Sequence, residues 1–256
     1  MQEVSNYRVR GVLVFFMILL WTGGAQAFDD GRKLRIGFGG AASSRLYKDL
    51  ENDKRYLPMP LIFGEDRRFF VEGIKAGVKV VNMKQCRLDV FIARGVNGYE
   101  ASDSPYLEGM AERKEAIEAG ARITYWSPVG GIKLSGSLDA SDTHNGGEAT
   151  LAYLMPIRTR RFTLIPSAGS TWRSGKQVDY YYGVRENEAT DFRKAYKPEA
   201  DVSGFVALSF DVPLAANLNM VGGVKAEYFG DEIHNSPIVN EDYSVAGHLG
   251  VVVTLL

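Results

Sequence analysis

The feature that most constrains this chain is a two-residue alternation of apolar and polar side chains, repeated along most of its length. In one such run, Ile132, Leu134 and Leu138 alternate with Lys133 and Ser137. Side chains on a β-strand point to opposite faces with a period of two residues. Each run therefore predicts a strand with one apolar face and one polar face.

The length of the runs separates two kinds of β protein. A soluble sandwich also alternates, but its strands usually have about 5 to 6 residues, whereas a tilted membrane-crossing strand needs about 9 to 11. Many of the runs reach this greater length. Charged groups such as Arg122 on the polar faces would be costly in a dry sandwich core. We therefore expect Leu134 and Val224 to face lipid, and Lys133 and Lys225 to face the lumen of a barrel.

The expected fold is all-β, an antiparallel transmembrane β-barrel of about twelve strands. An even strand number returns both chain ends to the periplasmic side. The break at Gly73 carries no obvious turn signal, so ten strands is the alternative. The predicted strands are 33–41, 56–64, 67–73, 75–82, 87–94, 115–126, 130–140, 147–156, 161–173, 201–212, 217–229 and 244–256.

The connections between these strands alternate in length. Short turns on one side and long loops on the other are typical of outer-membrane barrels. The short connections are 64–66, 82–85, 127–129, 157–160 and 213–216, and the longer polar ones are 42–55, 95–114, 174–200 and 230–243. Pro58 and Pro60 would each remove a ladder bond from the second strand, which predicts a bulge or a locally open seam there.

The first 27 residues have the layout of a cleavable secretory signal. Arg8 and Arg10 precede an apolar stretch, Gly11–Trp21, which is shorter than the roughly 20 residues that span a bilayer as a helix. Small side chains follow at Ala25 and Ala27, as a signal peptidase requires. We expect cleavage after Ala27, leaving a single barrel domain over 28–256, with a retained anchor as the alternative.

Composition excludes several function classes. A net charge of −1 argues against nucleic-acid binding, and the single Cys86 allows no intrachain disulfide. His144, His234 and His248 are too far apart in sequence to suggest a metal site, and no cofactor is predicted. We expect His248 to lie in the lumen and His144 to lie in a plain turn.

One loop offers a weak case for catalysis. His234 lies beside Asp231, Glu232 and Ser236. A hydrolytic site needs a nucleophile within about 3 Å of its base, with a third group orienting the base, and sequence neighbours do not establish that geometry. A solvated polar loop is the preferred interpretation, and a barrel hydrolase is the less favoured one.

Four sequence blocks occur in a fixed order, and together they resemble the MipA/OmpV family of outer-membrane proteins. Tyr181, Tyr182 and Gly183 would belong to its long-loop signature, and Ser236 and Pro237 to its last-loop block. The blocks are Tyr56-Leu57-Pro58-Met59-Pro60-Leu61 with Arg68-Phe69-Phe70, Tyr181-Tyr182-Gly183-Val184 with Glu188-Ala189, Tyr196-Lys197-Pro198, and Ser236-Pro237-Ile238-Val239.

The resemblance implies a function in the bacterial outer membrane. It implies a scaffold that holds a lytic transglycosylase and a bifunctional penicillin-binding protein together in murein synthesis. Because the sequence offers no clustered catalytic triad, we expect no enzyme activity. Some members are described as porin-like, so a channel for small solutes is the alternative. In a barrel of about twelve strands, side chains can either fill the lumen or leave it open.

Two groups of residues are candidates for contacts with partners. Arg158, Arg160 and Arg161 share one short turn on the expected periplasmic side, where they either contact a partner or anchor the turn at the lipid headgroups. Tyr180, Tyr181 and Tyr182 either face a partner or a glycan, or extend an aromatic strand at the membrane edge.

The signal sequence makes the first testable prediction. Protein recovered from outer-membrane fractions should begin at Phe28, with the sequence FDDGRK, when its N-terminus is determined by Edman degradation. Folded protein that retains Met1 would contradict it.

Overall fold

The structure is a computed structural model that describes residues 33–44, 46–48 and 57–255. The signal sequence 1–27 and its cleavage site lie outside the described residues, so their processing stays a prediction. Among the described residues, no helix combines the length and the apolar character needed to cross a membrane.

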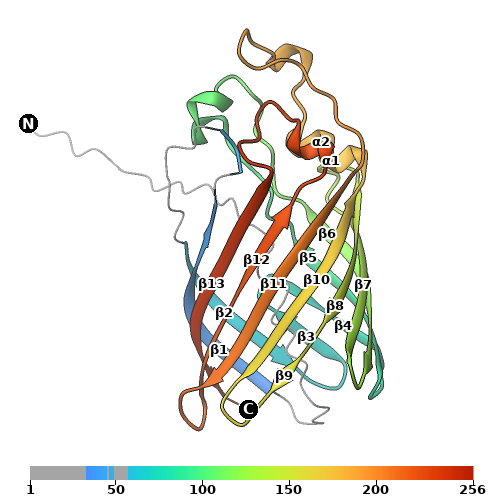
Figure 1. The fold of residues 1–256 in the computed structure, drawn as a ribbon, viewed down its shortest axis with the longest axis vertical. Coiled ribbons are helices and arrows are strands. Elements are labelled where there is room, and N and C mark those ends of the chain that lie inside the picture. Colours follow the sequence, from blue (N-terminus) through green and yellow to red (C-terminus); the bar gives the residue numbers. More distant parts are fainter. Residues whose placement is uncertain (1–32, 45, 49–56, 256) are drawn as a thin grey trace, which may run out of the picture.

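The described residues form a closed antiparallel β-barrel (Figure 1). The sheet has thirteen strands in sequential order, and it closes because β10 pairs with both β8 and β11. β9 has two residues and only continues the β8–β10 hairpin, so the wall has the twelve strands that the sequence predicted. The strands are β1 (Lys33–Ser43), β2 (Leu57–Glu65), β3 (Phe69–Glu72), β4 (Lys75–Asn82), β5 (Cys86–Arg94), β6 (Ile117–Ser127), β7 (Gly130–Asp139), β8 (Gly147–Leu154), β9 (Ile157–Arg158), β10 (Thr163–Arg173), β11 (Asp201–Pro213), β12 (Leu218–Tyr228) and β13 (Tyr243–Thr254).

The break at Gly73 is a turn, which excludes the ten-strand alternative. Gly73 has φ 59°, a conformation that glycine adopts without strain, and Glu72 pairs with Lys75 across the turn. β3 is nevertheless only four residues long, shorter than the predicted strand 67–73. Figure 1 shows β3 in the lower part of the wall.

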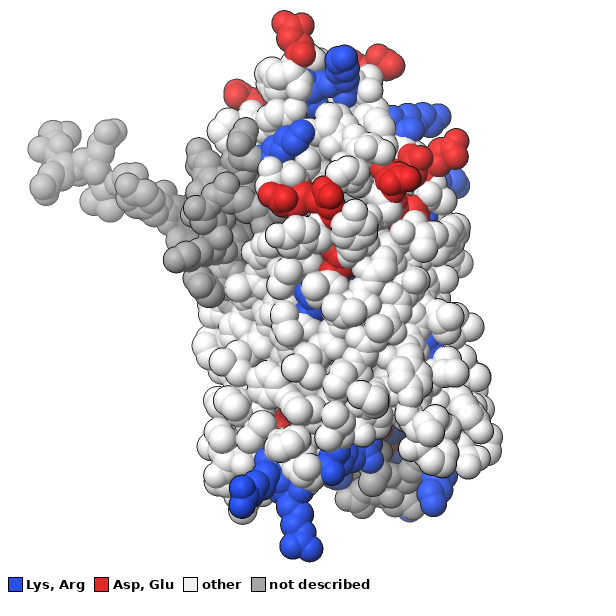
Figure 2. All heavy atoms as spheres, viewed as in Figure 1, with Lys and Arg blue, Asp and Glu red and all other residues white. Residues whose placement is uncertain are grey.

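The two ends of the barrel differ as expected. Short turns join the strands at the lower end of Figure 1, and the long connections gather at the upper end with all of the helical segments. Figure 2 shows acidic and basic side chains at the upper end, basic ones at the lower end, and few charges between them. The helical segments are η2 (Ala101–Asp103), η3 (Pro105–Leu107), α1 (Gly175–Tyr182), η4 (Glu186–Glu188) and α2 (Asp231–His234).

The two faces of the strands follow the predicted register. Leu134 and Val224 are 51% and 45% exposed on the outer face, where lipid would cover them. Lys225 points inward and contacts Glu227, with 2.8 Å between Nζ and Oε2. Tyr228 is exposed at the outer end of β12, as an interfacial aromatic residue should be. Its neighbour Phe229 is buried among the loops.

The first and last strands meet along a joint that is poor in side chains. Gly39 lies opposite Gly250 in the β1–β13 pairing. A Cβ atom at Gly37 would overlap the carbonyl oxygen of Val251, and one at Gly39 would overlap that of Leu249. Glycine at these positions therefore allows the two backbones to approach closely.

The observed register predicts how charge is tolerated on the two faces. Leu134→Arg should lower the free energy of unfolding by about 2–4 kcal/mol, because it places a cation in hydrocarbon. Lys133→Arg keeps a cation on the lumen face and should cost much less. Urea titration of protein refolded into lipid vesicles measures both values, and equal losses would contradict the assigned faces.

Candidate functional site: the barrel lumen and its loop cap

A buried charge cluster crosses the lumen from β6. Arg122 donates two hydrogen bonds of 2.7 Å to Glu72 on β3 and one of 2.6 Å to Asp89 on β5. All three side chains are almost fully buried. In a low-dielectric interior, such charges are tolerated only when they are paired and hydrogen-bonded. Arg122 therefore ties three strands of the wall together from the inside.

A second cluster is centred on Arg173 of β10. Its guanidinium donates to Glu227 of β12 at 2.6 Å and to Ser203 of β11 at 2.9 Å. Glu148 of β8 lies 3.9 Å away, and Lys225 also contacts Glu227. These polar faces alternate with the lipid-facing residues of the same strands, which explains why the sequence period predicted a charged lumen.

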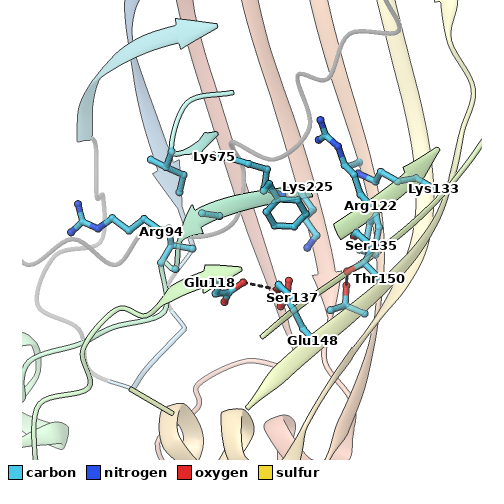
Figure 3. A pocket seen from close by; sticks show the side chains of 18 of the residues that line it. Lys75, Arg94, Glu118, Arg122, Lys133, Ser135, Ser137, Glu148, Thr150 and Lys225 are labelled. Atoms are coloured by element: carbon cyan, nitrogen blue, oxygen red, sulfur yellow. Dashed lines mark hydrogen bonds between the residues drawn. The ribbon is translucent and has the colours of Figure 1, made fainter. Parts of the chain in front are cut away.

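Between the clusters lies a cavity of about 80 Å³ (Figure 3). Glu118 accepts a hydrogen bond of 2.7 Å from Ser137 at its edge, and Arg94 points away from the other labelled side chains. His248 lines the cavity, as predicted for a lumen residue, and neither of its ring nitrogens has a hydrogen-bond partner among the described residues. The charged residues of the lining are Lys75, Arg94, Arg122, Lys133, Lys225, Glu118 and Glu148.

The long loops close the outer end of the barrel with a hydrophobic core of their own. Tyr47 and Tyr99 pack edge to face, with ring centroids 4.7 Å apart. Tyr181 and Tyr182 are each 2% exposed and lie in the same core. We call this core the loop cap; its buried members are Leu46, Tyr47, Tyr99, Leu107, Met110, Val178, Tyr181, Tyr182, Val184, Phe229, Ile233, Ile238 and Val239.

The family-motif residues hold the loop cap together. Tyr181 and Tyr182 lie on helix α1 and point inward, so both alternatives considered for them, an exposed surface and a strand extension, are wrong. Gly183 ends the helix, where a Cβ atom would overlap the carbonyl oxygen of Asp179. Ser236 donates a hydrogen bond of 2.6 Å to the carbonyl oxygen of Tyr182, and half-buried Pro237 follows it.

A buried ion pair that the sequence did not reveal links two loops. Arg113 contacts Glu188 through two hydrogen bonds of 2.8 and 3.0 Å, and its Nε donates to the carbonyl oxygen of Tyr180 at 2.7 Å. Burial alone would raise the pKa of Glu188, but the hydrogen bonds from Arg113 and from the backbone of Ala111 and Arg185 lower it below the ordinary value. No local sequence pattern predicts a contact between residues that are 75 positions apart.

The histidines do not form a hydrolytic site. His234 contacts Asp242 at 2.9 Å on the exposed surface, while Ser236 is buried and donates to the backbone. His144 was expected in a plain turn, yet it is buried against Tyr181, with ring centroids 5.6 Å apart. The described part of the chain contains no cluster of three potential metal-ligating His, Cys, Asp or Glu residues.

The three candidate arginines share one exposed turn at the lower end. Arg158, Arg160 and Arg161 are all exposed. Thr159 fixes the turn, because its hydroxyl oxygen accepts hydrogen bonds of 3.1 Å from the backbone of Arg161 and Phe162. The turn therefore presents three cations together.

Comparison with known proteins places this architecture in a family. Residues 36–254 match the family described as "MltA-interacting protein MipA". The chain belongs to the MipA family. It is similar to the putative outer-membrane protein YiaT of Escherichia coli K12, with 22% identity over 222 residues, which are 86% of this chain and 89% of YiaT.

Other relatives of this MipA-family chain match over shorter regions. Omp26La of Vibrio anguillarum is 26% identical over 55% of each chain, and OmpV of Vibrio cholerae is 25% identical over 56% of this chain and 55% of OmpV. The match thus spans about half the length of these two proteins. All three relatives are named outer-membrane proteins, and the barrel is consistent with that location.

Solved structures similar to the chain are also barrels. An outer-membrane channel from Pseudomonas putida F1 aligns with 90% of this chain and 98% of its own, with 9% identity and a TM-score of 0.46.

The buried pair in the loop cap makes a prediction about loop stability. Arg113→Met leaves Glu188 buried without its partner, which typically costs about 3–5 kcal/mol. The barrel should stay folded while the loops open more often and proteinase K cleaves them faster. Lys194→Met, which changes an exposed cation in the loop that contains Glu188, should leave the cleavage rate unchanged.

Acidification should also speed the cleavage of the loops by proteinase K in the wild-type chain. A carboxylate whose pKa is lowered by folding stabilises the fold above its unfolded pKa, and this stabilisation is lost as the pH falls through the folded value. Cleavage should therefore accelerate at acidic pH, and less so in Arg113→Met. Equal cleavage of Arg113→Met and Lys194→Met would contradict the role of the pair.

Proposed function

We propose that this MipA-family barrel is a scaffold of the outer membrane that holds a murein hydrolase and a murein synthase together, and that it acts through surface contacts. The proposed partners are a lytic transglycosylase and a bifunctional penicillin-binding protein. The family description, which names a protein that interacts with MltA, supports the first of these partners.

The observation that carries the proposal is that side chains cross the described lumen at several levels and cover its outer end. Charged clusters around Arg122 and Arg173 cross it, and the loop cap packs apolar side chains over its outer end. The cavity between the two clusters is about 80 Å³, space for a few water molecules. This favours the scaffold over the porin-like alternative, because a porin keeps an aqueous channel open.

The surface available to murein enzymes is the periplasmic end. Murein and its enzymes lie in the periplasm, where the short turns lie. Arg158, Arg160 and Arg161 are the candidate contact on that side, since they are adjacent, exposed and of one sign. Basic side chains gather at this end in Figure 2. A contact of this kind should weaken with salt, because screening shortens to about 3 Å at 1 M.

The test removes these three cations. Arg158, Arg160 and Arg161 changed together to Ser should leave a folded, heat-modifiable barrel. Recovery of murein hydrolase and synthase with the crosslinked barrel should fall roughly tenfold, as expected when about three exposed ion pairs of about 0.5 kcal/mol each are lost.

The matched control removes three cations from other turns of the same end. Arg67, Arg68 and Lys84 are exposed there, and their combined replacement by Ser should leave recovery unchanged. Wild-type recovery from the folded Arg158, Arg160 and Arg161 variant would reject this surface. Loss of folding in that variant alone would instead support anchoring of the turn at the headgroups.

A further inference from the structure

The loop between β7 and β8 holds a histidine beneath the loop cap. His144 is 6% exposed, and its ring lies against Tyr181 and Tyr180 of α1, with ring centroids 5.6 and 6.2 Å apart. The Asp139 carboxylate at the end of β7 accepts hydrogen bonds of 2.6 and 2.9 Å from the backbone of His144 and Asn145. The loop is therefore fixed to the barrel wall, and the imidazole is enclosed between the loop and the helix.

The hydrogen bond to the ring requires it to be neutral. Its Nδ1 accepts a hydrogen bond of 3.0 Å from the backbone N–H of Gly146. A neutral imidazole has one acceptor nitrogen and one N–H, whereas both nitrogens of an imidazolium are donors. Proton uptake by His144 would therefore set two N–H groups against each other. Nε2 is buried with no hydrogen-bond partner among the described residues, so the charged ring would have no acceptor at either nitrogen.

The groups around the ring do not compensate for a charge on it. Asp139 of β7 is the charged group that acts on His144, and it favours the protonated form. The two tyrosines of α1 bring no charge, and Lys176 and Asp179 of the same helix are exposed. Burial opposes the charge more strongly than Asp139 favours it, so the pKa of His144 lies below its ordinary value.

The same loop holds the start of helix α1. The backbone N–H of Ser174 donates to the carbonyl oxygen of Gly147, and the hydroxyl of Ser174 accepts from the backbone N–H of Gly147, both at 2.9 Å. Gly146 packs so closely that a Cβ atom there would lie 2.7 Å from the backbone nitrogen of Gln177. The helix carries two buried tyrosines of the loop cap. Displacement of the loop at His144 therefore displaces part of the cap.

We propose that His144 is a pH switch of the loop cap: proton uptake expels its ring from beneath α1, and the helix detaches from the rim of the barrel. Tyr182 of this helix interacts electrostatically with Arg173 and Glu148 of the lumen. Release of α1 therefore uncovers the charged lumen. The proposal is independent of the scaffold function, since it concerns the outer end of the barrel and not its periplasmic turns.

The switch works in a defined pH window. The closed cap excludes the proton and the open cap binds it, so the closed state loses stability as the pH falls below about 6.5, the ordinary pKa of histidine. The loss ends once the pH is below the pKa of the enclosed ring. Glu188 does not titrate in this window, because its pKa lies below the ordinary value of about 4.3.

The test measures hydrogen-exchange protection factors of the α1 backbone amides in purified protein in neutral detergent. Between about pH 7.5 and about pH 5.5, they should fall roughly threefold to tenfold, as expected for a group that binds a proton mainly in the open state. His144→Asn offers an acceptor that takes up no proton, and its factors should change less than about twofold. His234→Asn and His248→Asn, which change the other two histidines, should retain the fall.

Unchanged protection in the wild-type protein would overturn the proposal, as would an equal fall in His144→Asn or loss of the fall in His248→Asn. If His144→Asn fails to give a heat-modifiable barrel, NMR of the ring nitrogens decides. The double variant His234→Asn, His248→Asn has His144 as its only histidine. Its ring should stay neutral, with the proton on Nε2, for as long as α1 is protected. A ring that takes up a proton while α1 keeps its protection would overturn the proposal.

Discussion

The structure depends on one constraint, which is that backbone polar groups in hydrocarbon must find partners within the protein. A closed ladder of antiparallel strands meets it, and closure through the β10 pairings leaves no free strand at the ends of the sheet. Once the ladder is closed, the two-residue period assigns every side chain to lipid or lumen. β3 pairs with only Phe63, Gly64 and Glu65 of β2, and Pro58 and Pro60 in the rest of β2 have no N–H that would need a partner.

The charges in the lumen follow from this arrangement. A narrow interior with little water strengthens attraction between opposite charges and penalises unpaired ones. Arg122 and Arg173 accordingly bond to carboxylates on other strands and brace the wall from within. The loop cap completes the closure from outside with apolar packing. A barrel braced in this way is a rigid support, as the proposed scaffold function requires.

The sequence was informative where a short-range rule applied. Alternation predicted the twelve strands and the lumen position of Lys225, and the paired prolines predicted an irregularity in the second strand. It failed where distant segments meet. Helix α1 carries its buried tyrosines inside a loop whose local composition is polar, so only the packing of other loops reveals it. No spacing rule predicts the ion pair between Arg113 and Glu188 either, because the two residues meet only after the barrel has brought their loops together.

The glycine-rich joint between β1 and β13 has a consequence for assembly. Gly39 and Gly250 are 211 residues apart in sequence, so this pairing forms only after the whole chain has reached the membrane. The entropy of closing so long a loop grows only logarithmically with its length. Because glycine has no side chain, pairing at these two positions fixes no rotamers and requires no side chains to interlock. The final closure can therefore proceed as a direct zipping of two backbones, which shortens the interval in which both edges meet lipid unpaired.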